Sequence, residues 1–297
     1  MHASSIHVHT TFCDGHDDIE TFCRRAHEQG FGSIGFSAHA PVYKRAGIVS
    51  DWHLKDERLS EYIDAVHDAR RRWEGKLRVF CGLEADYIAG RMGPGDFRDL
   101  DLDYIIGSVH YLLPPKGGEP FEVDGPVEQF DRAVGEQFDG DGRALTTLYW
   151  NTLEGMIRAG GFDLLGHADL IKKNNGLHGC GTPLGHQGRW FSTEAPDYLS
   201  RFEKIAALIA ASGIPAEVNT GGLNRGKTNE VYPSLSLLRI LNTHKVPMTI
   251  NDDAHEVLHL GGHYDTARDG LRTAGYTTIL NFEGKSAGKA MWSEAAL

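Results

Sequence analysis

The sequence predicts an α/β fold in which strands and helices alternate and the strands close into a distorted or incomplete TIM-like barrel. Seven short runs rich in β-forming residues recur along the chain, each ends in polar residues, and helical patterns lie between them. Such alternation favours parallel βαβ units, and seven units suggest a barrel. The chain has 297 residues, of which 40% are hydrophobic, so we expect one large domain over residues 1–297.

The runs that predict strands are, in order, residues 5–9, 33–39, 77–84, 104–110, 162–167, 214–219 and 246–253. An eighth run, at residues 277–280, lacks a polar ending. Apolar residues at helical spacing predict helices within residues 59–73, 198–209 and 235–241. In barrels of this type the active site lies at the carboxyl ends of the strands, which is where the polar endings fall.

Two long segments interrupt this alternation. Residues 112–143 are rich in Gly, Pro and Asp, and we expect a long loop with a short helix near residues 128–134. Residues 176–190 form a second segment, rich in Gly and His. Long loops on the active face of a barrel often gate a pocket, although plain surface decoration explains them equally well.

The composition excludes several classes of protein. A formal net charge of −11, with acidic residues spread along the chain, disfavours binding to nucleic acid or to an anionic membrane. No apolar run approaches the roughly 20 residues of a transmembrane helix, and the N-terminus does not resemble a secretory signal. Four scattered cysteines argue against a disulfide framework. We expect a cytoplasmic protein, and the sequence indicates no oligomeric state.

The polar residues at the strand ends are of the types that bind metal ions. His7 and His9 flank one apolar residue, and residues i and i+2 of a strand point to the same face, so their imidazoles should converge. The full candidate set is His7, His9, Asp14, His39, Glu84, His110, His167, Asp253 and His255. Nine ligands are too many for one ion, and a carboxylate can bridge two. We therefore expect two or three divalent ions, for which Zn, Mn and Fe are equally suitable.

The ordered motifs resemble the polymerase-and-histidinol-phosphatase (PHP) superfamily, and in particular its histidinol-phosphate phosphatase branch. They span nearly the whole chain and lie at residues 7–10, 36–41, 82–87, 106–110, 166–173, 217–223 and 252–255. The branch assignment depends mainly on Gly-Leu-Glu-x-Asp-Tyr, Gly-Ser-Val-His, Gly-His-x-Asp-Leu-Ile-Lys-Lys and Asn-Thr-x-Gly-Leu. The resemblance implies a distorted (β/α)7 barrel, in agreement with the seven runs.

The resemblance also implies a site of three ions. Carried over residue by residue, the ligands form three groups: His7, His9, Glu84 and Asp253; Glu84, His110 and His167; and His39, His255 and one residue of the turn after His9. Asp14 is the expected ligand from that turn, and His16 is its rival. The chain departs from the family pattern at Ala38, where Asp is common, and at Asp252, where Ser is common. Neither departure removes a ligand, although the loss at position 38 weakens the expected support for His39.

The implied reaction is the hydrolysis of L-histidinol phosphate, a small phosphorylated substrate of histidine biosynthesis. A hydroxide bridging two ions would attack phosphorus, and Asp253 or His255 would return a proton to the leaving oxygen. Arg225 is the first candidate to bind the phosphate and Lys173 the second. The loop at residues 119–124 is a candidate for binding the amino and imidazole groups.

Three other functions compete with this one. A related phosphoesterase acting on nucleotides or other small phosphate esters would share the metal site. A proofreading nuclease is disfavoured by the acidic charge and by the lack of a basic, aromatic-lined groove. A non-catalytic metal-binding module would not need so many ligands.

Overall fold

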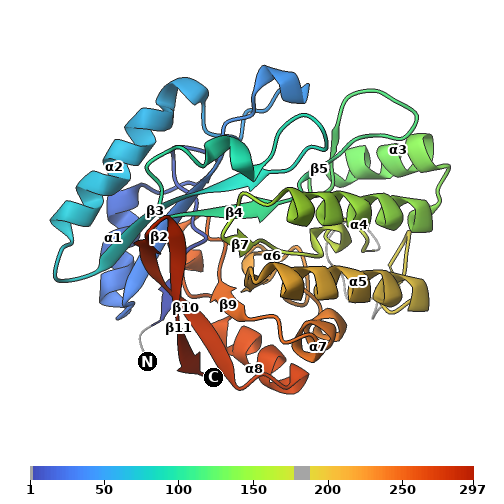
Figure 1. Ribbon diagram of the computed structural model, residues 1–297. Helices are drawn as coiled ribbons and strands as arrows, with labels where there is room; N and C mark the ends of the chain where they lie inside the picture. The colour runs from blue at the N-terminus through green and yellow to red at the C-terminus, as the bar shows by residue number, and fades with distance from the viewer. Residues whose placement is uncertain (1–2, 177–187) are drawn as a thin grey trace.

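The computed structural model describes residues 3–176 and 188–297 (Figure 1). Its centre is a parallel sheet with the strand order β1-β2-β3-β4-β7-β8-β9. These strands are β1 (Ser4–Ser5), β2 (Ser33–His39), β3 (Arg78–Asp86), β4 (Tyr104–Ser108), β7 (Leu164–Leu165), β8 (Ala216–Asn219) and β9 (Met248–Asn251). Each of the seven predicted runs supplies one strand, so the predicted α/β barrel is confirmed.

The sheet nearly closes between its first and last strands. Val8, just beyond β1, forms a parallel bridge with Ala254, just beyond β9. The backbone N–H of His9 donates to the carbonyl of Ala254 at 2.9 Å. This closure places the chain that carries His7 and His9 directly beside the chain that follows β9.

Helices cover the outside of the barrel. They are α1 (Ile19–Glu28), α2 (Leu59–Arg72), α3 (Val127–Phe138), α4 (Gly142–Ala159), α5 (Pro196–Ser212), α7 (Leu235–Thr243) and α8 (Tyr264–Ala274). The four-residue α6 (Gly221–Asn224) instead follows β8 at the carboxyl end, where Gly221 lies against Asp253. Short 3-10 turns occur at Lys44–Ala46, Asp56–Arg58, Pro94–Phe97, Leu170–Lys172 and Val257–His259. In Figure 1, α1 and α2 flank one side of the sheet, and α4 and α5 flank the other. The three predicted helices correspond to α2, α5 and α7, and each buries an apolar stripe.

The segment at residues 112–143 is more ordered than predicted. A small antiparallel pair, β5 (Tyr111–Leu112) and β6 (Phe121–Glu122), opens it. Instead of a short helix near residues 128–134, α3 runs through Gly135 to Phe138. The glycine weakens the helical pattern in the sequence, but burial of Phe130, Val134 and Phe138 stabilises the longer helix. Of the second segment, residues 177–187 lie outside the described residues.

A hairpin of β10 (Thr278–Ser286) and β11 (Lys289–Ala296) covers the amino end of the barrel. The eighth run therefore belongs to an antiparallel pair and not to the barrel. Phe282 of β10 packs edge-on against Phe80 and Tyr104, at ring distances of 4.9 and 5.1 Å. These packed aromatic side chains fill the amino end of the barrel, so a pocket can open at the carboxyl end. Among the described residues, no helix combines the length and apolarity needed to cross a bilayer.

Candidate metal centre

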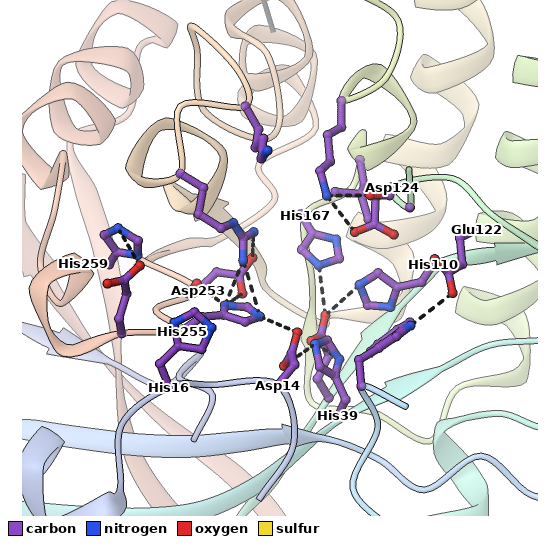
Figure 2. A pocket seen from close by; sticks show the side chains of 18 residues that line it. Asp14, His16, His39, His110, Glu122, Asp124, His167, Asp253, His255 and His259 are labelled. Carbon is purple, nitrogen blue, oxygen red and sulfur yellow. Dashed lines mark hydrogen bonds and ion pairs between the residues drawn. The ribbon is translucent and has the colours of Figure 1, made fainter. Parts of the chain in front are cut away.

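The carboxyl end of the barrel holds a pocket of about 360 Å³ (Figure 2). Seven of the predicted ligands line it: Asp14, His39, Glu84, His110, His167, Asp253 and His255. The other two, His7 and His9, are fully buried in the same cluster. The structure therefore brings all nine predicted side chains together from strand ends that are far apart in the sequence.

The predicted strand at residues 5–9 is shorter in the structure, because β1 ends at Ser5 and His7 and His9 lie beyond it. The isolated bridge of Val8 to Ala254 lies between the two histidines, whose rings are 5.2 Å apart. His7 Nε2 lies 3.1 Å from Glu84 Oε2, and His9 Nε2 lies 3.4 Å from the same oxygen. Asp253 faces the same two nitrogens, with Oδ1 3.3 Å from His9 Nε2 and 3.7 Å from His7 Nε2. Its backbone is left-handed, with φ 49°, a conformation that aspartate tolerates better than most residues. These four side chains form the first predicted group.

Glu84 lies at the centre of the cluster, and its two oxygens face different histidines. Oε2 faces Nε2 of His7 and Nε2 of His9, and it lies 3.0 Å from Nδ1 of His39. Oε1 lies 2.9 Å from His167 Nε2 and 3.5 Å from His110 Nε2, and it accepts a hydrogen bond from Ser108 at 2.7 Å. A carboxylate with one oxygen in each of two imidazole groups has the geometry of a bridge between two ions.

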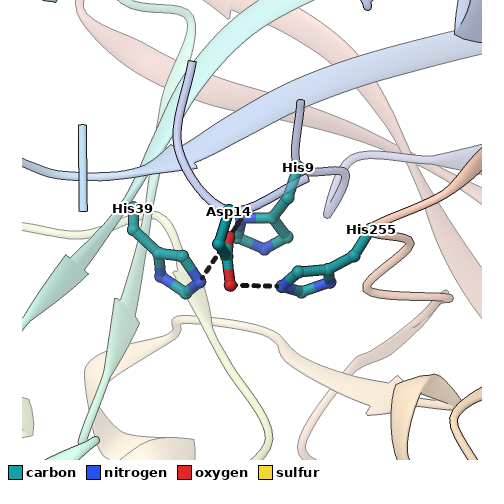
Figure 3. A group of neighbouring side chains, drawn as sticks. All are labelled: His9, Asp14, His39 and His255. Atoms are coloured by element: carbon teal, nitrogen blue, oxygen red, sulfur yellow. Dashed lines mark ion pairs between the residues drawn. The ribbon is translucent and has the colours of Figure 1, made fainter. Parts of the chain in front are cut away.

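An outer group is formed by His9, Asp14, His39 and His255 (Figure 3). Asp14 Oδ2 lies 3.1 Å from His255 Nε2, and Asp14 Oδ1 lies 3.6 Å from His39 Nε2. The side chain of His16 lies on the pocket wall and is absent from the ligand groups found among the described residues. The geometry thus favours Asp14 over His16, and it adds His9 to the group that was predicted from His39 and His255.

Unpartnered buried atoms test whether these residues fit metal ions. His7 Nε2, His9 Nε2, His39 Nδ1, Asp14 Oδ1 and Glu84 Oε2 are buried and take part in close ion pairs, but none of them forms a hydrogen bond among the described residues. Buried polar atoms are normally hydrogen-bonded, because leaving one unpaired costs roughly 1–3 kcal/mol. Five such atoms converge in one cluster, and a metal ion would use their lone pairs. Imidazole with carboxylate suits a divalent transition metal.

Burial and neighbouring charges shift the pKa values of the clustered side chains. Burial would raise the pKa of the Glu84 carboxyl, but the imidazoles of His7, His39 and His110 outweigh burial and hold its pKa well below the usual range. Burial lowers the pKa of His110, but Asp86 and Glu84 raise that pKa to about 10. Burial, followed by the neighbouring His39 and His255, lowers the pKa of His9 to about 3. The cluster therefore holds charged carboxylates that require positive charge beside them.

Two carboxylates that the sequence analysis did not select hold the histidines in place. Glu217 on β8 accepts a hydrogen bond from His7 Nδ1 at 3.0 Å and from the backbone N–H of His167 at 2.9 Å. Asp86 on β3 accepts from His110 Nδ1 at 2.9 Å. Period-two spacing was an available signal, because Asp86 stands two residues after Glu84 on the same strand and so shares its face.

The predicted phosphate-binding residues both line the pocket, but each is engaged. Arg225 Nη2 lies 3.1 Å from Asp253 Oδ2, and its Nη1 lies 2.8 Å from His255 Nδ1. Lys173 Nζ donates to the carbonyl and to Oδ2 of Asp124, at 2.6 and 3.2 Å. From the loop at residues 119–124, Glu122 and Asp124 reach the pocket.

The PHP domain profile matches residues 5–221, which cover β1 to the start of α6. The chain belongs to the PHP domain family. A relative from Deinococcus radiodurans named "Probable histidinol-phosphatase" is 30% identical over 277 residues, covering 92% of this chain and 94% of the relative. The histidinol-phosphatase of Bacillus subtilis is 24% identical over 279 residues, covering 87% and 96%.

The PHP fold also matches a solved structure. The histidinol phosphate phosphatase of Lactococcus lactis, crystallised with zinc, L-histidinol and phosphate, superposes with a TM-score of 0.65 over 97% of this chain and 98% of that one. Its sequence identity is 18%, so this likeness supports the fold. The predicted resemblance to the PHP superfamily is confirmed.

Proposed function

We propose that the protein is a metal-dependent phosphomonoesterase that hydrolyses L-histidinol phosphate to L-histidinol and phosphate. The observation that carries the proposal is the cluster of unpartnered imidazole and carboxylate atoms at the floor of a pocket whose wall holds Arg225. The names of the Deinococcus and Bacillus relatives support this substrate, as do the ligands of the Lactococcus structure.

Three groups of residues would hold two or three divalent ions: His7, His9, Glu84 and Asp253; Glu84, His110 and His167; and His9, Asp14, His39 and His255. The spacing of the ligand atoms also permits another division, in which His167 joins His7 and Asp253, and His110 joins His39 and Glu84. When bound, Zn, Mn or Fe at these positions supplies positive charge to the phosphate oxygens and lowers the pKa of a water molecule. The protein contributes the fixed geometry, because Glu217 and Asp86 orient His7 and His110.

Arg225 is the first phosphate ligand in this proposal. Its guanidinium lies between Asp253 and His255 at the edge of the cluster, with Nε buried and unpartnered among the described residues. A phosphate oxygen beside the cluster would accept hydrogen bonds from this planar group. Lys173 is the second phosphate ligand, and it would have to share its ammonium with Asp124.

The leaving alkoxide needs a proton, and His255 or Asp253 would supply it after accepting it from the attacking water molecule. His255 lies between Asp14 and Arg225 on the pocket wall. Asp253 lies beneath it and contacts the same arginine. One of the two would return a proton to the leaving oxygen, and the other would remain a ligand of the centre.

The organic part of the substrate would face the wall formed by Glu122 and Asp124. L-Histidinol phosphate carries an ammonium group and an imidazole, and carboxylates suit both. Glu122 Oε1 is already oriented by hydrogen bonds from Trp52 Nε1 at 3.1 Å and Tyr111 Oη at 3.2 Å. This wall would distinguish histidinol phosphate from phosphate esters whose organic part carries no positive charge.

A panel of phosphomonoesters tests the proposal. Protein replete with Zn, Mn or Fe would be assayed with L-histidinol phosphate, nucleoside monophosphates and sugar phosphates. We expect the highest kcat/KM for L-histidinol phosphate. A clear preference for a nucleotide or sugar phosphate would instead support a related phosphoesterase, and no phosphate release from any ester would reject the enzymatic function.

A further inference from the structure

His53 is a buried histidine that stands behind the metal centre without belonging to it. It lies on the loop between β2 and α2, with only 4% of its surface exposed. Its Nε2 is 2.9 Å from Oδ2 of Asp86, which is itself 2% exposed. Neither side chain lines the pocket, so neither is placed to touch an ion or a substrate.

Asp86 connects His53 to a candidate metal ligand. Its Oδ1 lies 2.9 Å from His110 Nδ1 and 3.2 Å from the backbone nitrogen of His110. An ionised carboxylate only accepts hydrogen bonds, so the nitrogens of His53 and His110 that face Asp86 both carry hydrogen. In a neutral His110 ring, Nε2 then keeps its lone pair, and this atom points towards Glu84. That is the tautomer that a metal ligand requires.

The other nitrogen of His53 extends a chain of hydrogen bonds in which every donor points towards Asp86. With its hydrogen on Nε2, a neutral His53 accepts at Nδ1, and Ser50 Oγ lies 2.6 Å from that atom. The hydroxyl of Ser50 therefore donates to His53, His53 donates to Asp86, and Asp86 also accepts a hydrogen bond from His110 Nδ1.

Aromatic contacts link the same loop to the pocket. Trp52 stacks on the His53 ring at 3.7 Å with an interplanar angle of 26°. The Trp52 ring also meets His39 edge-on at 4.6 Å and lines the pocket. A shift of His53 would therefore move a pocket wall as well as the carboxylate behind His110.

We propose that His53 is a positioning residue that, through Asp86, holds His110 in the orientation and tautomer needed to bind an ion. Without His53, Asp86 Oδ2 would be left buried without its donor, and the carboxylate would turn towards other donors. This turn would weaken its hold on His110 Nδ1. The inference rests on the proposed metal centre but not on the identity of the substrate.

Metal affinity measured without substrate tests this role. Metal-free protein would be titrated with Zn²⁺ against a chromophoric chelator, with the bound ions counted by elemental analysis. His53→Phe keeps a ring against Trp52 but removes the donor, whereas His53→Gln keeps a donor near the position of Nε2. His67→Ala, on the outer helix α2, is the matched control.

We expect His53→Phe to weaken one ion of the cluster by about 10–100-fold, as is typical when the partner of a metal-binding histidine is lost. His53→Gln should stay close to the wild-type affinity, and His67→Ala should equal it. Ser50→Ala, a milder change on the same chain of hydrogen bonds, should weaken the same ion to a smaller extent and guards against misfolding of the phenylalanine variant.

Wild-type affinity in both His53→Phe and Ser50→Ala would overturn the positioning role. So would an equal loss in His53→Gln and His53→Phe, because that result would assign the effect to packing and not to the donor. If the wild-type chain itself bound no divalent ion, the proposed metal centre would fail, and the titration would distinguish that failure from the first two.

Discussion

His7 and Glu217 stand 210 residues apart in the sequence and share a buried hydrogen bond, with His7 Nδ1 3.0 Å from Glu217 Oε2. Both side chains are fully excluded from solvent. Because Glu217 accepts a hydrogen bond from Nδ1 of His7, the other ring nitrogen of His7, Nε2, is directed to Glu84. Asn219 and Asn251 each donate to Glu217 at 2.8 Å and hold this carboxylate in place.

Replacing Glu217 tests this orientation. Glu217→Gln keeps the volume of the side chain but weakens its acceptor for His7, and its amide hydrogens would oppose those of Asn219 and Asn251. We expect metal affinity to fall by about 10–100-fold while the fold is retained. Chelator competition measures the affinity, and circular dichroism checks the fold. Unchanged affinity would show that His7 needs no partner at Nδ1.

Glu84 is the proposed bridge, so its loss should affect more than one ion. Glu84→Gln removes the charge but keeps the shape, and we expect fewer ions per chain and a fall in kcat of at least about 100-fold. Elemental analysis and phosphate release are the measurements. Glu74→Gln, at an exposed position, is the control. Full metal content and activity in Glu84→Gln would contradict the bridging role.

Asp14 and His16 make opposite predictions for the outer group. Asp14 lies within 3.1 Å of His255, whereas the His16 ring lies on the pocket wall. Asp14→Asn should therefore lower the number or affinity of bound ions, and His16→Gln should leave both unchanged. The reverse result would exchange the two residues as ligand of the outer group.

Arg225 should matter to substrate more than to metal. Arg225→Ala removes hydrogen bonds to the phosphate that are worth roughly 1.5–3 kcal/mol, so kcat/KM for L-histidinol phosphate should fall about 10–150-fold. Arg239→Ala, exposed on α7, is the control. Unchanged kinetics in Arg225→Ala would remove this arginine from the site.

Removing the ions should destabilise the fold. Glu84, Asp253 and Asp14 would then face one another with less compensating charge, and a ligand that binds only the folded state adds to its stability. We expect a chelator to lower Tm and readdition of Zn²⁺ to restore it. Equal Tm values with and without metal would show that no ion is bound under the conditions used.

The sequence predicted the barrel and all nine clustered side chains, because strand periodicity and polar strand ends are local signals. His7 and His9 are two residues apart, and Glu84 ends its run. Partners that support the ligands were not predicted. Glu217 and His53 act on atoms 210 and 33 residues away, so only the folded chain relates them to the site. The length of α3, which continues through Gly135, was underestimated for the same reason. Burial of its apolar side chains outweighs the low helix propensity of the glycine.

The most direct test of the central claim is phosphate release from L-histidinol phosphate by metal-free protein before and after reconstitution. We predict negligible release without metal and restored turnover when two or three Zn, Mn or Fe ions are bound per chain. Equal turnover in the metal-free protein, or none after full reconstitution, would contradict a metal-dependent histidinol phosphatase.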